Sequence, residues 1–207
     1  MFNTSKIVKK EGQQISDIER DVAKALQLFE NENTGMTHLQ TLFINSAEAC
    51  QYTDARGAKA MYYLIRVPFR SLGAIRKSAD ALINFLEEKF KLPIMVIANR
   101  TIQSPNAITH ASQKRPRSRT LKAVHAAILE DIVAPSFVTG RQTRVAVDGH
   151  RTEKVFLHPL DREMMEPRLE AMTAAYQKLT THHVHFEFSK LTAFQQAKIE
   201  KDKKKRQ

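Results

Sequence analysis

Apolar residues recur every three or four positions in four stretches of the chain, the spacing expected of helices that bury one face. The first stretch begins at Ser16 and runs to Phe29. Ser16 and Glu19 stand three residues apart, which is the sequence signature of a capping box at a helix start. We therefore predict a helix there, and three more in the stretches at residues 71–90, 121–132 and 166–179.

The third of these predicted helices has well-marked ends. Thr120 is suited to cap its N-terminus, and Pro135 is expected to stop it because proline cannot continue a helix. Its expected core face consists of the apolar residues at helical spacing, Leu121, Val124, Ile128 and Ile132. The methionines near the fourth helix are interpreted as adaptable core packing, namely Met164, Met165 and Met172.

Short apolar or alternating runs predict strands between the helices. One hairpin starts at Leu42 and returns from Ala60 to Pro68 through a TDARG turn, and a second has Asp148-Gly149 between two alternating runs. Single strands are expected at residues 93–100 and 184–188. This order predicts an α+β fold with mixed, largely antiparallel strands packed with helices, plus a long basic loop and a basic C-terminal extension.

Positive charge is concentrated in two of the four segments that this order suggests. The expected segments are an N-terminal α+β lobe (1–100), a basic RNA-binding loop (101–119), a C-terminal helix-hairpin-helix-strand lobe (120–188) and a basic tail (189–207). The net charge is +11, yet Lys89 to Leu129 alone carries +8 without one acidic residue, and the tail carries +5. The remainder is slightly acidic. Such local basicity indicates a polyanionic partner.

The segment from Thr101 to Ser118 has no apolar periodicity and is longer than most connections inside a compact domain. Its end, QKRPRSRTL, places cations at the start of a predicted helix, where acidic residues are normally favoured. Phosphates bound at that helix end would explain the reversal, because free N–H groups, the helix dipole and the cations would act on the same anions. An extended backbone would project arginines two residues apart to one side. The candidate contacts are Lys114, Arg115, Arg117 and Arg119.

Other interpretations of the basic segment stay open. It can be a solvated loop beside a solubilising tail, and KRPRSR would also serve as a nuclear import signal. Ser118 among arginines is a candidate phosphorylation site. A polybasic membrane patch is less favoured because no lipidation motif or amphipathic anchor accompanies it.

Catalytic and metal-binding patterns are absent from the sequence. Cys50 is the single cysteine, which excludes an internal disulfide and fits a reducing compartment. In HHVH, His183 and His185 would share one strand face and His182 would lie on the other, a poor metal geometry. No P-loop, GxGxxG, GxSxG or HExxH pattern occurs. We expect a soluble, intracellular protein without catalytic residues, metal, cofactor, small-molecule substrate or membrane span.

The QKRPRSRTL block, followed by AVHAAILED and the Pro135-Ser136 break, resembles the ribosomal protein seven family of the eukaryotic small subunit, which is unrelated to the bacterial protein of that number. The agreement extends to SKIVK at Ser5 to Lys9, VDGHR at Val147 to Arg151 and VHFEF at Val184 to Phe188. It therefore spans nearly the whole chain. The residues beyond the VHFEF strand lie past it, so the resemblance implies no role for the tail.

The resemblance implies a structural constituent of the small ribosomal subunit that binds small-subunit ribosomal RNA, lies beside other small-subunit proteins and supports subunit biogenesis and translation. Cytoplasmic ribosomes with a nucleolar assembly stage are the implied location. An RNA-processing enzyme and an adaptor for acidic proteins are the alternatives, and neither has a catalytic cluster or a partner motif in its favour. Besides the four cations of the loop, weaker candidate RNA contacts are Arg100, Lys122, Arg141, Arg144 and Arg151.

Overall fold

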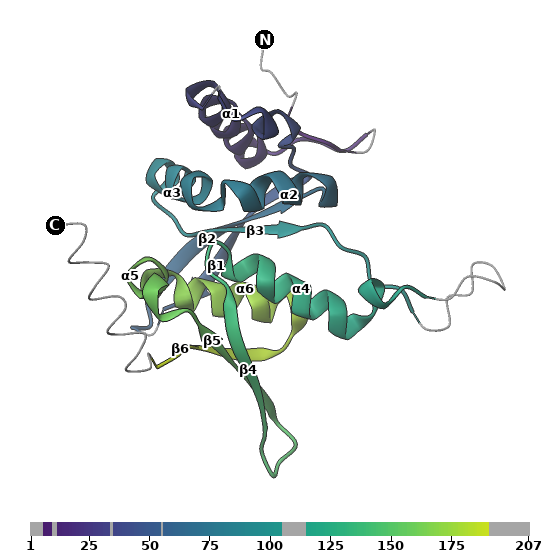
Figure 1. The fold of residues 1–207 in the computed structure, drawn as a ribbon, viewed down its shortest axis with the longest axis vertical. Coiled ribbons are helices and arrows are strands. Elements are labelled where there is room, and N and C mark those ends of the chain that lie inside the picture. Colours follow the sequence, from purple (N-terminus) through teal and green to yellow (C-terminus); the bar gives the residue numbers. More distant parts are fainter. Residues whose placement is uncertain (1–5, 10–11, 34, 55, 105–114, 191–207) are drawn as a thin grey trace.

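A computed structural model describes the chain at residues 6–9, 12–33, 35–54, 56–104 and 115–190. Its strands form two three-stranded sheets (Figure 1). The first sheet contains β1 (Ser46–Thr53), β2 (Lys59–Val67) and β3 (Ile94–Ala98), in that order. The second contains β4 (Val138–Val145), β5 (Arg151–Leu157) and β6 (His183–Phe188), also in that order. The α+β prediction is confirmed.

Both sheets follow the same plan. In each, the first two strands form an antiparallel hairpin and the third strand pairs parallel to the second. A parallel pair needs a crossover, and helices supply it on both occasions. The helices are α1 (Asp17–Glu32), α2 (Phe69–Lys77), α3 (Ala79–Phe90), α4 (Leu121–Val133), α5 (Arg162–Met165) and α6 (Leu169–Thr180).

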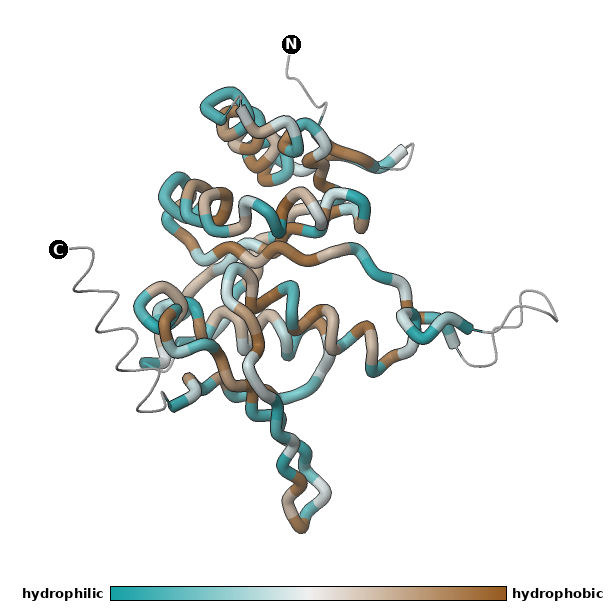
Figure 2. Tube along the Cα trace, in the orientation of Figure 1, coloured by the Kyte–Doolittle hydropathy of each residue, from teal (hydrophilic) through white to brown (hydrophobic). Residues whose placement is uncertain are grey.

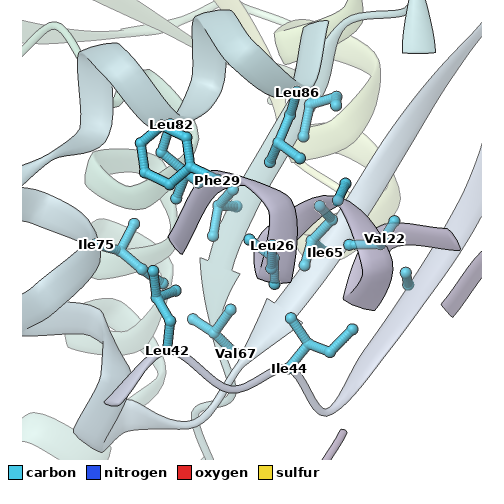
Figure 3. Packing of buried hydrophobic residues seen from close by; sticks show 14 of the residues in the cluster. Val22, Leu26, Phe29, Leu42, Ile44, Ile65, Val67, Ile75, Leu82 and Leu86 are labelled. Atoms are coloured by element: carbon cyan, nitrogen blue, oxygen red, sulfur yellow. The ribbon is translucent and has the colours of Figure 1, made fainter. Parts of the chain in front are cut away.

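The first hydrophobic core lies between one face of the first sheet and helices α1 to α3 (Figure 3). Alternation along β2 sends Ile65 and Val67 into this core, where they meet Val22 and Leu26 of α1. Leu82 and Leu86 of α3 close it from the other side. The periodicity seen in the sequence thus arises from helices α1 to α3 packed on one face of the first sheet.

The opposite face of the first sheet belongs to a second core. Tyr62, Leu64 and Met95 alternate with the residues above and pack against α4, α6 and the inner face of the second sheet. All five residues of β3 are buried, since helices cover both of its faces. Figure 2 shows the same pattern, with β3 as a continuous hydrophobic band through the middle of the molecule. No described helix is long and apolar enough to cross a bilayer.

The capping box predicted at the start of α1 is confirmed. The Ser16 hydroxyl accepts the Glu19 backbone N–H at 3.3 Å, and Glu19 Oε2 accepts the Ser16 N–H at 2.8 Å. Glu19 Oε2 also binds Lys9 Nζ at 2.6 Å. Burial opposes ionisation of Glu19, but the hydrogen bonds from Lys9, Ser16 and Ala47 outweigh it and hold its pKa below the ordinary value.

We predict that Glu19→Gln lowers the free energy of unfolding by about 1–2 kcal/mol at pH 7, because the amide keeps the cap but loses a charge-assisted bond to Lys9. A depressed carboxylate pKa contributes stability above the unfolded pKa and loses it as pH falls through the folded one. The difference between wild type and variant should therefore shrink below about pH 4.5. Urea unfolding at pH 7 and pH 3.5 measures it; an equal difference at both values would contradict this account.

Several predicted elements have different bounds in the structure. The helix expected at 71–90 divides at Ser78, which leaves helical geometry at φ −125° and ψ 27°. Its N–H donates to Ile75 and its carbonyl accepts from Leu82, so the chain turns without losing backbone bonds. The helical spacing of apolar residues continues across Ser78 because α2 and α3 bury their apolar faces in the same core. The strand expected from Leu42 begins at Ser46, after a short 3-10 helix.

The core face predicted for α4 was partly wrong. Val124 and Ile132 are buried, but Leu121 is half exposed at the first turn and Ile128 is only partly buried. The residues that the prediction missed are the buried Leu129, Asp131 and Val133. The cause is that the C-terminal half of α4 packs on both β3 and α6, so no single face describes it.

The last helical region is shorter than predicted. Pro167 lies in a 3-10 turn at Glu166–Arg168, and α6 begins only at Leu169, because proline offers no N–H for a continuous helix. Met165 and Met172 are fully buried as expected, whereas Met164 is exposed. The second hairpin is confirmed: Gly149 has φ +80° and its N–H donates to Ala146, which closes the Asp148-Gly149 turn.

Candidate nucleic-acid interface

The N-terminus of α4 lacks a side-chain cap. Thr120 occupies the N-cap position as predicted, but its hydroxyl donates to the Arg117 carbonyl at 2.7 Å instead of accepting a helix N–H. No acidic residue lies in the first turn. No described side chain therefore satisfies the first-turn N–H groups, and the partial positive charge of the helix end is uncompensated.

The arginines before α4 are not arranged as the sequence suggested. Arg117–Arg119 forms a 3-10 turn, so the extended row of side chains predicted for Arg115, Arg117 and Arg119 is wrong. Pro116 remains extended, but the turn that follows directs successive side chains around an axis at about three residues per turn. Arg117 and Arg119 are exposed and make no ion pair with a described carboxylate. Their cationic groups stay available to an external anion.

Arg115 is used at the base of the basic loop. Its Nη1 donates to the Gln103 carbonyl at 3.1 Å, while the Gln103 N–H donates to the Arg119 carbonyl at 3.0 Å. Gln103 is thus held from both sides, which brings the two ends of the loop together next to α4. Lys114, the fourth cation predicted for this site, lies outside the described residues.

Arg100 lies in an internal ion cluster near the C-terminal end of α4. Its guanidinium reaches Asp131 Oδ2 at 2.8 Å and Oδ1 at 3.1 Å, and its Cζ lies 5.4 Å from the centroid of the Phe69 ring. Arg76 contributes a further bond at 3.0 Å and the Ala98 N–H another at 3.2 Å. The Asp131 side chain is completely buried. Arg100 is therefore tied inside the protein, unlike Arg117 and Arg119.

Sequence reasoning missed Asp131 altogether. The available signal was a pair of carboxylates inside the largely apolar ILEDIV stretch, together with an arginine two residues after the strand β3. A charged residue at such a position is almost never buried without a partner. The signal could have suggested an ion pair, but the sequence offered several arginines and no way to choose among them.

Three of the weaker candidates come together in one groove. Lys122, Arg141 and Arg151 line a hollow of about 430 Å³ between α4 and the base of the β4–β5 hairpin. Arg141 binds Glu130 at 3.1 Å and the Ala126 carbonyl at 3.3 Å. Lys122 and Arg151 are exposed and have no ion pair among the described residues. Together with Arg117 and Arg119 at the adjacent helix end, the three groove cations Lys122, Arg141 and Arg151 form what we call the loop-end site.

Two histidines lie at the inner end of this groove. The rings of His125 and His182 meet edge to face at 5.3 Å. Burial, followed by the nearby His182, lowers the pKa of His125, and Glu153 opposes the shift. His182 is thus separated from His183 and His185, which are exposed on the other side of β6. Among the described residues, no group of three or more His, Cys, Asp or Glu side chains could hold a metal ion.

Arg144 is separated from the groove by the hairpin itself. In the β4–β5 register Arg144 is opposite Thr152, whereas Arg141 is opposite Val155, a residue of the second core. Side chains that are an odd number of positions apart point to opposite faces of a strand, and Arg141 and Arg144 are three positions apart. Arg144 therefore lies on the outer face of the second sheet. The structure brings together Arg117, Arg119, Lys122, Arg141 and Arg151, and it leaves Arg100 and Arg144 elsewhere.

Comparison with known proteins identifies a protein family that matches most of this chain. The family model described as Ribosomal protein S7e matches residues 6–188. The Small ribosomal subunit protein eS7z of Arabidopsis thaliana is 40% identical over 191 residues, which are 91% of this chain and 97% of that protein. The Small ribosomal subunit protein eS7 of Schizosaccharomyces pombe is 38% identical over 191 residues (91% and 96%), and that of Drosophila melanogaster 35% over 188 (89% and 94%).

Proposed function

Because the chain belongs to the ribosomal protein S7e family, we propose that it is a structural, non-catalytic component of the small ribosomal subunit that binds small-subunit ribosomal RNA through the loop-end site. The observation that carries the proposal is the uncapped N-terminus of α4 next to Arg117, Arg119 and Lys122, which make no ion pair with any described residue. Phosphates would satisfy both the free N–H groups and the guanidinium groups.

The charge arrangement supports RNA over an acidic protein partner. Arg117, Arg119 and Lys122 lie within six residues and continue into Arg151 across the groove. A line of separated cations around a hollow suits a backbone that carries a charge at every nucleotide. An enzymatic role has no support from the groove, where the partly buried His125 faces another histidine and no described group of His, Cys, Asp and Glu side chains could hold a metal ion.

Further parts of the proposal follow from the same site and family. The protein would contact neighbouring small-subunit proteins, support subunit biogenesis and translation, and reside in cytoplasmic ribosomes after a nucleolar assembly stage. The exposed part of KRPRSR, Pro116 to Arg119, would be accessible to an import receptor before RNA covers it, and Ser118 lies within that part. Import and RNA binding would then use the same surface at different times.

Salt-dependent binding to small-subunit ribosomal RNA tests the proposal. If Arg117, Arg119, Lys122 and Arg151 each neutralise one phosphate, the slope of log affinity against log salt should be at least about 3–4 in magnitude. The RNA should be recovered intact, as expected for a protein without catalytic groups. A slope near zero, or RNA cleavage by the pure protein, would contradict the proposal.

A further inference from the structure

The outer face of the second sheet is a surface that the loop-end site does not use. Helices α4 and α6 cover the inner face through Val155, Leu157, Val184 and Phe186. In Figure 1 the β4–β5 hairpin extends from the body, with the helices on one side of the sheet. The residues of opposite parity, from all three strands, therefore lie on the side away from the second core.

The strand register places these residues in three rows. Arg144, Thr152 and His183 form the first row, and Gln142, Lys154 and His185 form the second. Gly140, Phe156 and Glu187 form the third. We call the nine residues the outer face. Neighbouring strands are separated by about 4.8 Å and successive rows by about 6.6 Å, so the charged groups lie within one small patch.

The outer face carries more positive than negative charge. Glu187 is the one carboxylate of the nine, and Lys154 Nζ already binds it. That hydrogen bond is the main reason that the pKa of Glu187 lies below its ordinary value, with further contributions from His185 and Arg144. Arg144 is exposed and has no ion pair with a described residue. One permanent cation is therefore left uncompensated at neutral pH.

Three histidines add hydrogen-bonding groups next to this charge. His183 and His185 are exposed on β6, and the His150 ring lies 5.1 Å from that of His183 at the base of the hairpin turn. His183 faces His150, Thr152 and, across β5, Arg144. His185 faces Lys154 and Glu187, and the distance from His185 Nε2 to Glu187 Oε1 is 3.4 Å. Each exposed imidazole can donate a ring N–H to a phosphate oxygen beside Arg144.

We propose that the outer face is a second RNA-phosphate surface, so that the β4–β5 hairpin lies between two RNA segments, one in the groove and one on the sheet. This inference rests on the proposed RNA-binding function and names a further surface for it. Charge complementarity selects the occupant: beyond the Lys154–Glu187 pair the face keeps the uncompensated Arg144, and it has no exposed hydrophobic patch within its rows. Arg141 and Arg151 on one side and Arg144 on the other let a single hairpin contact both segments.

The test compares wild type with the triple variant Arg144→Ala, His183→Ala, His185→Ala. If Arg144 contacts one phosphate, the slope of log RNA affinity against log salt should fall by about 1 in this variant, and loss of the two imidazoles should weaken the affinity further. The matched control, Thr152→Ala, changes the same face without changing its charge. Combined with loop-end substitutions, the slope changes should add, since the two faces contact different phosphates.

The outcomes separate this inference from the proposed function. Wild-type protein without salt-dependent RNA binding would refute both. Wild-type binding that is weakened by loop-end substitutions but keeps its slope in the outer-face variant would refute this inference alone. Binding of the same variants to polyglutamate is measured in parallel: a loss of polyglutamate binding with an unchanged RNA slope would also overturn the inference, in favour of an acidic protein partner. If the triple variant unfolds, Arg144→Gln alone provides the comparison at an exposed position.

Discussion

Replacing Asp131 by alanine is expected to lower the free energy of unfolding by about 3–5 kcal/mol, the usual cost of breaking a buried ion pair from one side. The Asp131 side chain is fully buried, and Arg100, its bidentate partner, is only 16% exposed. Without the carboxylate, the Arg100 guanidinium and the Ala98 N–H would lose their acceptor in a place that water barely reaches. Arg76 should matter less, because its side chain is 53% exposed and can be solvated.

The neighbouring Glu130 offers a matched control on the same helix. Its ion pair with Arg141 joins two exposed side chains, so Glu130→Ala should change stability by no more than about 1 kcal/mol. Chemical unfolding of both variants at pH 7 makes the comparison. Similar small losses for the two would mean that the Asp131 cluster is solvated in solution, and the account of Arg100 as an internal anchor would fail.

The second large effect is expected on RNA binding. Replacing Arg117, Arg119 and Lys122 by alanine should lower the salt slope by about 2–3, at roughly 0.7–0.9 per phosphate contact. All three side chains are exposed and unpaired among the described residues, so the folded protein should lose little stability. Removing cations beside a positive helix end can even stabilise the free protein by a few tenths of a kcal/mol. Arg115 is left unchanged because it holds the loop base through Gln103.

A variant with the same charge change elsewhere provides the control. Arg20, Lys24 and Lys89 are exposed cations on α1 and α3, outside the groove and the α4 N-terminus. Their replacement by alanine should leave the slope nearly unchanged. An unaltered slope in the loop-end variant, combined with a clear drop in its thermal unfolding temperature, would show that these residues serve the fold, and the phosphate assignment would have to be abandoned.

Local patterns in the sequence predicted the elements whose geometry is local. The capping box at Ser16 and the Asp148-Gly149 turn depend on contacts within a few residues, and both are present as predicted. The buried strand before Arg100 was equally readable, since an unbroken apolar run indicates burial on both faces. The concentration of cations near α4 is likewise a property of the sequence alone.

Tertiary structure decided the rest, because it depends on which surfaces meet. The apolar periodicity does not reveal the break at Ser78, because the buried residues of α2 and α3 continue the same helical spacing and pack into the same core. In any extended strand Arg141 and Arg144 point to opposite faces, because they are three residues apart. Only the packing of α4 and α6 on the sheet shows which of the two faces the groove. Asp131 selects Arg100 and Arg76 from many arginines because β3 and α2 lie beside the end of α4. The charge distribution in the sequence therefore indicated a polyanionic partner, whereas the fold determined which described cations remain without an internal ion pair.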